Sequence, residues 1–375
     1  MKQKTTRRAF VQSGAAAGVA SALAVPTTVR AADPINAASL KLGKGLRDLS
    51  DETISFFLQM GVEHVVMPGR FTTERRSRGL VPATAQGPQN DNPITPLDAD
   101  ELIRIKKHLA DRGLSAEMVR LPRSWRILHG KPGAEEDFGA LKASIQAAGR
   151  AGIPVMEYNF TPLRGSEGYA RTTGRGDSGL RDFDHARVEN LPPLPNVGEH
   201  SREQMWERLE RFLKELVPVC EDSDVRLALH PNDPPIPIFR GAAQPTRSLD
   251  DLKQLIDLVD SPANGITLDT GVTTEMGEDA AEAIRYFGSR DRINHVHYRN
   301  VRVEIPYFKY LETMHDEGVC DMLAAMRAFA EVGYSRLLIP DHAPEFSDDS
   351  PGSEISWAFA LGYLRSLRHA ASENV

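Results

Sequence analysis

Four strand-like runs of the sequence each end in a residue that can bind a metal ion: His230, Asp269, His297 and Asp341. In the run 226–230, alternation directs Leu227 and Leu229 to one face and His230 to the other. The same alternation directs Asp269, His297 and Asp341 inward at the ends of their own runs. Two imidazoles and two carboxylates suit a divalent ion such as Mn²⁺, and also Co²⁺, Fe²⁺ or Zn²⁺. We expect the four side chains to share one metal site.

Each of these residues alone has a simpler interpretation. A histidine at a strand end is more often hydrogen-bonded within the core, which is how we interpret His295. Asp269 alone would serve as the cap of a following helix. The repetition of such residues at equivalent places on four strands favours the metal site.

The elements that must position these residues form eight strand–helix units. The expected strands are 40–45, 62–67, 115–121, 155–160, 225–230, 265–269, 293–298 and 335–340. The expected helices are 51–60, 99–112, 135–151, 201–219, 249–259, 279–287, 321–332 and 354–370. Strict alternation over eight units predicts an α/β protein with a closed (β/α)8 TIM barrel, as one domain over residues 32–375.

Two connections, 68–98 and 161–200, are too long for ordinary turns. Both follow expected strands, so both belong to the rim where barrel enzymes place their active sites. They are rich in arginine: Arg70, Arg75, Arg76 and Arg78 in the first, and Arg164, Arg171, Arg175, Arg181 and Arg187 in the second. Most single arginines of this kind only solvate a loop, but as a group they favour a small anionic substrate such as a sugar acid.

The first 31 residues have the features of an export signal. Basic residues open the chain, a weakly apolar stretch spans 9–25, and a signal peptidase would accept Ala31 or Ala32 as the last residue removed. The run Thr6-Arg7-Arg8-Ala9-Phe10 is typical of twin-arginine signals. The apolar stretch is too short and polar for a stable membrane span. We expect a periplasmic or secreted mature protein.

Charge and cysteine content exclude several classes of protein. The 375 residues carry a formal charge of −7, which argues against nucleic acid or an anionic membrane as partner. Cys220 and Cys320 are a hundred positions apart, which excludes a zinc ribbon or a disulfide scaffold. Nothing in the sequence decides between a monomer and a homo-oligomer.

Several motifs resemble those of one enzyme family. His230-Pro-Asn-Asp-Pro-Pro235 is similar to the His-Pro-Asp-Asp-Pro-Pro signature of the metal-dependent mannonate dehydratases, which have a xylose isomerase-like barrel. Residues 158–162 resemble that family's Tyr-Asn-Phe-Met-Pro, and residues 297–301 its His-Leu-Arg-Asn-Val. Residues 170–172, 315–322 and 340–342 resemble further motifs in the same order, so the resemblance runs along nearly all of the mature chain.

The resemblance implies β-elimination of water from D-mannonate, which gives 2-dehydro-3-deoxy-D-gluconate. It places His230, His297 and Asp341 on the family's metal-ligand positions and His342 on its acid/base histidine. Tyr158, Glu157 or His315 would then be the second proton-transfer group. The implied substrate-binding residues are two arginines for the carboxylate and two amides for hydroxyls: Arg171, Arg299, Asn300 and Asn159.

The chain departs from the family's motifs at three places. Asp269 stands where the family has a cysteine, and the exchange of thiolate for carboxylate favours Mn²⁺ and increases the tolerance for Mg²⁺. Glu157 also stands where the family usually has cysteine. The family's late Tyr-Gly-Leu-Tyr-Asp segment has become 353–357, so a tyrosine near the substrate has no clear counterpart.

Two other functions stay open at the level of sequence. One is a metal-dependent sugar isomerase or epimerase of the same barrel superfamily, which needs a similar ion and base but expels no water. The other is a non-catalytic, exported barrel that binds a sugar acid, which the missing tyrosine suggests.

Overall fold

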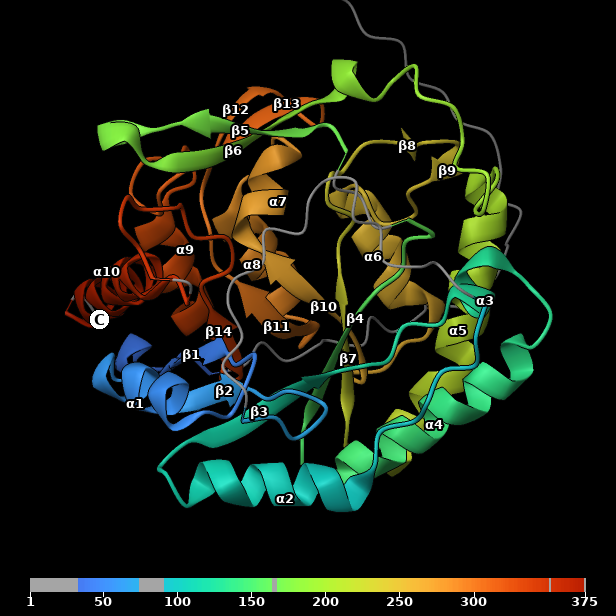
Figure 1. Ribbon diagram of the computed structural model, residues 1–375, viewed down its shortest axis with the longest axis horizontal. Helices are drawn as coiled ribbons and strands as arrows, with labels where there is room; N and C mark the ends of the chain where they lie inside the picture. Colours follow the sequence, from blue (N-terminus) through green and yellow to red (C-terminus); the bar gives the residue numbers. More distant parts are fainter. Residues whose placement is uncertain (1–32, 74–90, 164–166, 351, 374–375) are drawn as a thin grey trace, which may run out of the picture.

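A closed barrel of parallel strands forms the centre of the molecule (Figure 1). The computed structural model describes residues 33–73, 91–163, 167–350 and 352–373, so the expected leader and Arg75, Arg76, Arg78 and Arg164 lie outside the described residues. In spatial order the strands are β1 (Lys41–Gly45), β14 (Leu337–Ile339), β11 (Ile293–His297), β10 (Asn264–Asp269), β7 (Arg226–His230), β4 (Val155–Asn159), β3 (Ser115–Arg120) and β2 (His64–Val66). The predicted TIM barrel is confirmed.

Long helices surround the barrel and cover its outer face (Figure 1). They are α1 (Asp51–Gln59), α2 (Ala99–Ala110), α4 (Ala134–Arg150), α5 (Arg202–Asp222), α6 (Leu249–Leu258), α8 (Ala280–Gly288), α9 (Met322–Glu331) and α10 (Glu354–Ser372). Each overlaps an expected helix. The start of α5 shows why the sequence marks these helices well, because Ser201 and Gln204 form a reciprocal capping box there.

The barrel interior is filled by an apolar layer below the strand ends. Its six side chains come from five strands, two of them from β14: Val66, Met118, Val155, Ala228, Leu337 and Ile339. On β7, Leu227 and Leu229 point outward into the layer between strands and helices, whereas Ala228 points inward. The alternation read from the sequence therefore holds, and it directs His230 into the barrel mouth.

A second sheet covers one side of the mouth. Four antiparallel strands in the order β12 (Val301–Ile305), β13 (Lys309–Glu312), β6 (Gly179–Asp184) and β5 (Tyr169–Thr173) form what we call the rim sheet, at the top of Figure 1. The long connection 161–200, which we expected on the rim, supplies β5 and β6 of this sheet. Phe183 and Tyr310 stack at 5.2 Å and anchor a small apolar cluster under the sheet.

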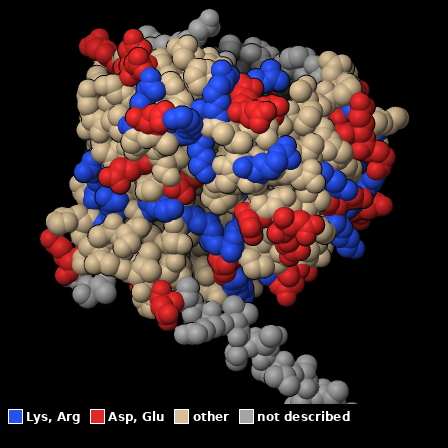
Figure 2. All heavy atoms as spheres, turned by 90° about the horizontal axis from the view of Figure 1, so that it is seen from below, with Lys and Arg blue, Asp and Glu red and all other residues tan. Residues whose placement is uncertain are grey.

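Several shorter elements complete the described chain: α3 (Trp125–His129), α7 (Thr270–Glu275), the paired β8 (Ile238–Phe239) and β9 (Ala242–Ala243), and the 3-10 turns η1 (Ala37–Ser39), η2 (Arg175–Asp177) and η3 (His185–Arg187). None of the described helices combines the length and apolar character that crossing a bilayer requires. On the face near α2, shown in Figure 2, acidic and basic side chains are interspersed.

Candidate active site

A cavity of about 620 Å³ opens at the carboxyl ends of the barrel strands. Its walls come from the ends of β3, β4, β7 and β11, from the segment after β14, and from two strands of the rim sheet. This is the end of a barrel at which enzymes of this architecture carry out their chemistry.

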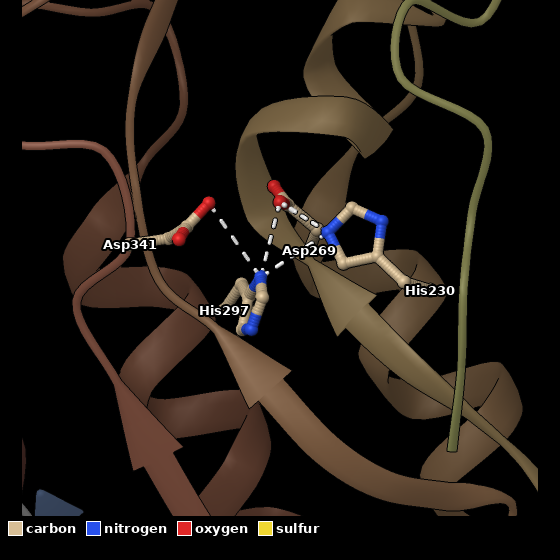
Figure 3. Close-up of side chains that lie close together, drawn as sticks. All are labelled: His230, Asp269, His297 and Asp341. Atoms are coloured by element: carbon tan, nitrogen blue, oxygen red, sulfur yellow. Dashed lines mark hydrogen bonds and ion pairs between the residues drawn. The ribbon is translucent and has the colours of Figure 1, made fainter. Parts of the chain in front are cut away.

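The four expected metal ligands meet at one side of this cavity (Figure 3). Their ligand atoms all lie within 4.8 Å of one another. His230 Nε2 is 3.2 Å from His297 Nδ1 and 3.4 Å from Asp269 Oδ2, and His297 Nδ1 is 3.6 Å from Asp341 Oδ2. Two atoms that each lie about 2.1 Å from one ion are about 3.0–3.4 Å apart at ordinary coordination angles. The side chains therefore fit a single cation with small inward movements.

Both imidazoles are held with one nitrogen facing this centre. His230 Nδ1 lies 2.7 Å from the carbonyl oxygen of Pro231, and His297 Nε2 lies 3.0 Å from Glu157 Oε1. A carbonyl oxygen only accepts hydrogen bonds, so His230 Nδ1 carries a proton, and the negative charge of Glu157 favours a proton on Nε2 of His297. His230 Nε2 and His297 Nδ1 then present lone pairs to the centre, as metal-binding histidines do.

The electrostatics of the cluster also favour a cation. Burial alone would raise the pKa of Asp269, but Arg299 and His230 outweigh it and lower that pKa to about 2. For His230, burial works against the charged form, yet Asp269, Glu157 and Asp341 raise its pKa to about 9. The surplus of carboxylates thus stabilises positive charge at this point.

Asp269 combines two roles. Its Oδ1 accepts a hydrogen bond from Val272 N at 2.8 Å and caps α7, while its Oδ2 faces the cluster and accepts one from Arg299 Nε at 3.0 Å. The helix-capping interpretation and the ligand interpretation are therefore compatible.

Arg299 occupies a different place from the one expected. Its side chain is 1% exposed and lies among four carboxylates: Asp269 at 3.0 Å, Glu275 at 2.7 Å, Asp233 at 2.9 Å and Asp341 at 3.8 Å. A Cβ on Gly271 would come within 2.7 Å of Arg299 Cγ, which explains why the close packing needs glycine here. Arg299 orients Asp269 from behind and does not reach a substrate in the cavity.

Two more expected substrate contacts also lie elsewhere. Asn300 is buried, and its amide bridges the carbonyls of His315 and Cys320 at 3.1 and 3.3 Å. Arg171 is largely exposed and pairs with Glu345 at 2.8 Å, outside the lining of the cavity. Asn300 therefore shapes a loop, and Arg171 ties β5 to the segment after β14.

Three residues of β4 line the cavity: Glu157, Tyr158 and Asn159. Asn159 Oδ1 accepts a hydrogen bond from Arg123 Nη2 at 3.2 Å, so its amide can still reach a ligand. Glu157 is buried and contacts both His297 and Arg120, the latter at 3.2 Å. These contacts make it a positioning residue for His297. Arg120 and Arg123, which sequence reasoning missed, could have been found from their place at the end of the third strand.

Tyr158 and His315, expected as proton-transfer groups, do not join the cluster. The ring of Tyr158 stacks on Phe212 of α5 at 5.0 Å, and its buried hydroxyl has no hydrogen-bond partner among the described residues. Tyr158 borders the cavity, but burial raises the pKa of its hydroxyl well above the ordinary value. His315 is fully buried, and burial lowers its pKa to about 4. His315 lies outside the lining of the cavity, so it does not reach a substrate there.

His342 lines the cavity and adjoins the metal ligands. Its Nε2 lies 3.2 Å from Asp341 Oδ2, and its Nδ1 lies 3.0 Å from Glu312 Oε2. Glu312 comes from β13 of the rim sheet, and Arg181 from β6 contacts both Glu312 and His342. His342 is thus a partly exposed imidazole held between two carboxylates, which suits a general acid or base.

The signature 230–235 has a structural explanation for each polar residue. His230 is a ligand of the cluster. Asn232 Oδ1 accepts hydrogen bonds from the backbone and hydroxyl of Thr246 at 2.7 and 3.0 Å, which fixes the turn after β7. Asp233 accepts hydrogen bonds from Arg299 and from the hydroxyl of Tyr169 at 2.5 Å, so it ties the rim sheet to the barrel.

Known proteins resemble this chain in sequence. The family model of D-mannonate dehydratase (UxuA) matches residues 196–375. A mannonate dehydratase of Enterococcus faecalis is 33% identical over 267 residues, which are 61% of this chain and 73% of that protein. One from Thermotoga maritima is 30% identical over 281 residues, which are 65% of this chain and 77% of that protein.

Solved structures share the fold. The mannonate dehydratase of Streptococcus suis superposes with a TM-score of 0.75 at 24% identity, over 89% of this chain and 94% of that one. A 3-keto-D-glucoside 4-epimerase from E. coli gives 0.55 at 14% identity, over 87% and 99% of the two chains. By sequence and by its barrel, the chain belongs to the mannonate dehydratase family and is an enzyme of the hydro-lyase class.

Proposed function

We propose that this enzyme removes water from D-mannonate and forms 2-dehydro-3-deoxy-D-gluconate, with Mn²⁺ held by His230, Asp269, His297 and Asp341. The observation that carries the proposal is the convergence of these four ligands beside His342 in one cavity of a family member. The donor set contains no sulfur, and two hard carboxylates with two imidazoles favour Mn²⁺ over softer ions.

The reaction requires removal of a weakly acidic proton next to a carboxylate. A bound divalent ion supplies electrostatic stabilisation of the negative charge that develops on that carboxylate. His342 Nε2, beside Asp341, accepts the proton from C2, and the bond electrons form the C2–C3 double bond. The C3–O bond breaks, and the imidazolium of His342 donates the same proton to the departing hydroxyl. Water and an enol result, and the enol becomes the 2-keto acid.

Glu312 stabilises the protonated form of His342. Its Oε2 lies 3.0 Å from Nδ1, so its negative charge favours the imidazolium that forms when Nε2 accepts a proton. Burial by itself would raise the pKa of Glu312, but Arg181 and His342 outweigh it and hold that pKa well below its usual range. Glu312 is therefore ionised at neutral pH.

The proposal is tested with purified protein that is stripped of metal and reloaded with Mn²⁺. Incubation with D-mannonate is expected to yield a 2-keto-3-deoxy acid, and an Asp269→Asn variant treated in the same way should yield none. A product that retains all its oxygen atoms, formed from a panel of aldonates and ketoses, would instead identify an isomerase or epimerase. Binding of mannonate without turnover under any divalent ion would identify a non-catalytic barrel.

We also propose that residues 1–31 direct twin-arginine export and that the mature enzyme acts in the periplasm or outside the cell. The motif around Arg7 and Arg8 supports this. Cell fractionation should find the wild type outside the cytoplasm, with a mature amino terminus at Ala32 or Asp33. The double variant Arg7→Lys, Arg8→Lys should stay inside, uncleaved. A cytoplasmic, full-length wild type would contradict the proposal.

A further inference from the structure

A single arginine of the rim sheet, Arg181 on β6, reaches the cavity beside the proposed base. We propose that Arg181 binds the carboxylate of the sugar-acid substrate and so determines that the enzyme selects acids over neutral polyols. This inference rests on the proposed function and assigns a specificity-determining residue to its site.

The guanidinium of Arg181 is held in place before any ligand binds. Its Nε and Nη2 donate to the two carboxylate oxygens of Glu312 at 3.0 and 2.6 Å. The ring of Tyr169 lies under the guanidinium carbon at 4.3 Å. A guanidinium fixed in this way loses little freedom when it binds an anion, which increases the affinity it can provide.

The opposite edge of the guanidinium is available. Among the described residues, the hydrogen bonds of Arg181 use only Nε and Nη2, and its side chain lines the cavity and is 44% exposed. Nη1 can therefore donate to a carboxylate oxygen while Glu312 stays in place.

Arg181 lies where a group that binds the substrate carboxylate is needed. Arg181 Nη2 lies 3.2 Å from His342 Nδ1, so the guanidinium and the imidazole are neighbours. In the substrate, the carboxylate is bonded directly to C2, the carbon that loses its proton. A group that holds the carboxylate must therefore lie next to the base. As the proton leaves, negative charge grows on the carboxylate oxygens, and the contact with Arg181 becomes stronger.

The other arginines near the site are less well placed to bind the substrate carboxylate. Arg299 is enclosed by four carboxylates, and Arg171 pairs with Glu345 away from the cavity. Arg120 and Arg123 line the cavity, but Arg120 pairs with Glu157, and Arg123 contacts Asn159 and the ring of Trp125. Of the described arginines that line the cavity, Arg181 is the one that forms a hydrogen bond with His342.

A purely structural role for Arg181 is the alternative. Arg181 and Glu312 are directly opposite each other on β6 and β13, so their ion pair also joins two strands of the rim sheet. A structural pair would affect the stability of the sheet and would leave the preference for acids over polyols unchanged.

The test measures binding by Mn²⁺-loaded protein that carries His342→Gln to prevent turnover. Affinities for D-mannonate and D-mannitol, which share one carbon skeleton, are compared with and without Arg181→Met. We expect Arg181→Met to reduce the mannonate-to-mannitol affinity ratio at least tenfold, with mannitol affinity changed less than threefold. Arg181→Lys keeps the charge, so its affinity ratio should lie between those of Arg181 and Arg181→Met. In the otherwise unchanged enzyme, Arg181→Met should lower kcat/KM about 10²–10³-fold.

Arg187→Met is the matched control, because Arg187 follows β6 and pairs with Asp182 outside the cavity. It should leave the ratio unchanged. A folded Arg181→Met protein with normal manganese content and an unchanged ratio would overturn the inference. If the wild type does not dehydrate mannonate but binds another aldonate in an Arg181-dependent way, only the proposed substrate fails. If it binds no aldonate, both proposals fail.

Discussion

His230, Asp269, His297 and Asp341 could be found from the sequence because their positions follow from strand geometry alone. Parallel strands of a barrel end at the same mouth, and alternation fixes which side chains point inward. Beyond the end of a strand the same reasoning is less secure, because the backbone turns: it placed Asp341, two residues past β14, correctly, but not every residue after β11. Arg299 and Asn300 illustrate this, because their side chains are enclosed by Glu275 and by the carbonyls of His315 and Cys320.

Replacement of His342 tests its assignment as the acid/base group. His342→Ala should abolish turnover, because the described cavity offers no second imidazole beside Asp341 that is outside the ligand set. Metal content, measured by elemental analysis of the purified variant, should stay near that of the wild type. A variant that has lost its metal would show instead that His342 is a ligand.

Glu312 should matter for rate more than for substrate affinity. Glu312→Gln keeps the size of the side chain but removes the charge that orients His342, so kcat should fall about 10–100-fold, as for other residues that orient histidines in metal sites. Steady-state kinetics on the manganese enzyme checks this. Glu304→Gln, which breaks an exposed pair with Lys309 on the same sheet, is the control. A wild-type kcat in Glu312→Gln would refute the positioning role.

At the level of elements, the barrel strands were predictable and the rim sheet was not. Barrel strands are short apolar runs, and helices between them carry caps such as Ser201 and glycines just past their ends. The rim strand Tyr169–Thr173 has partly or fully exposed residues throughout, so it lacks the apolar alternation that marks a strand. Its pairing with β6 is set by tertiary contacts such as the hydrogen bond from Tyr169 to Asp233, which local sequence does not encode.

The opposite end of the barrel carries an ionic contact that joins three strands. Glu117 on β3 contacts Lys41 on β1 at 3.0 Å and His64 on β2 at 2.8 Å. Burial alone would raise the pKa of Glu117, but His64 and Lys41 outweigh it and lower that pKa to about 2. Because the folded pKa lies below the ordinary value near 4.5, the stabilisation is complete above pH 4.5 and is lost as the pH falls toward 2.

Glu117→Gln should therefore lower the free energy of unfolding at pH 7 by about 1–2 kcal/mol. Urea unfolding of variant and wild type at several pH values measures the difference. The difference should shrink steadily between pH 4.5 and pH 2.5. A difference that is constant or grows in acid would contradict the assigned contacts.

For the whole molecule, alternation of strands and helices predicted the closed barrel, and closure brings together residues more than a hundred positions apart. The cavity could not be predicted from the sequence. Its walls combine the ends of barrel strands with the rim sheet, and the contacts between these parts depend on the complete fold.

Metal binding should stabilise the whole fold, since the ion binds the assembled site and the unfolded chain has none. At a free Mn²⁺ concentration about 100 times the Kd, the gain is about 2.7 kcal/mol. Thermal unfolding with and without a chelator should show a higher Tm for the loaded protein. His230→Ala, which lacks one ligand, should show little response to Mn²⁺. An equal response in wild type and variant would place the stabilising ion elsewhere.

The most direct test of the account is anomalous diffraction from crystals of the Mn²⁺-loaded enzyme. We predict one manganese peak, about 2.0–2.3 Å from His230 Nε2, Asp269 Oδ2, His297 Nδ1 and Asp341 Oδ2. A peak at another cluster, such as Asp233, Glu312 and His342, or no peak at these four side chains, would contradict the metal site on which the proposed dehydration depends.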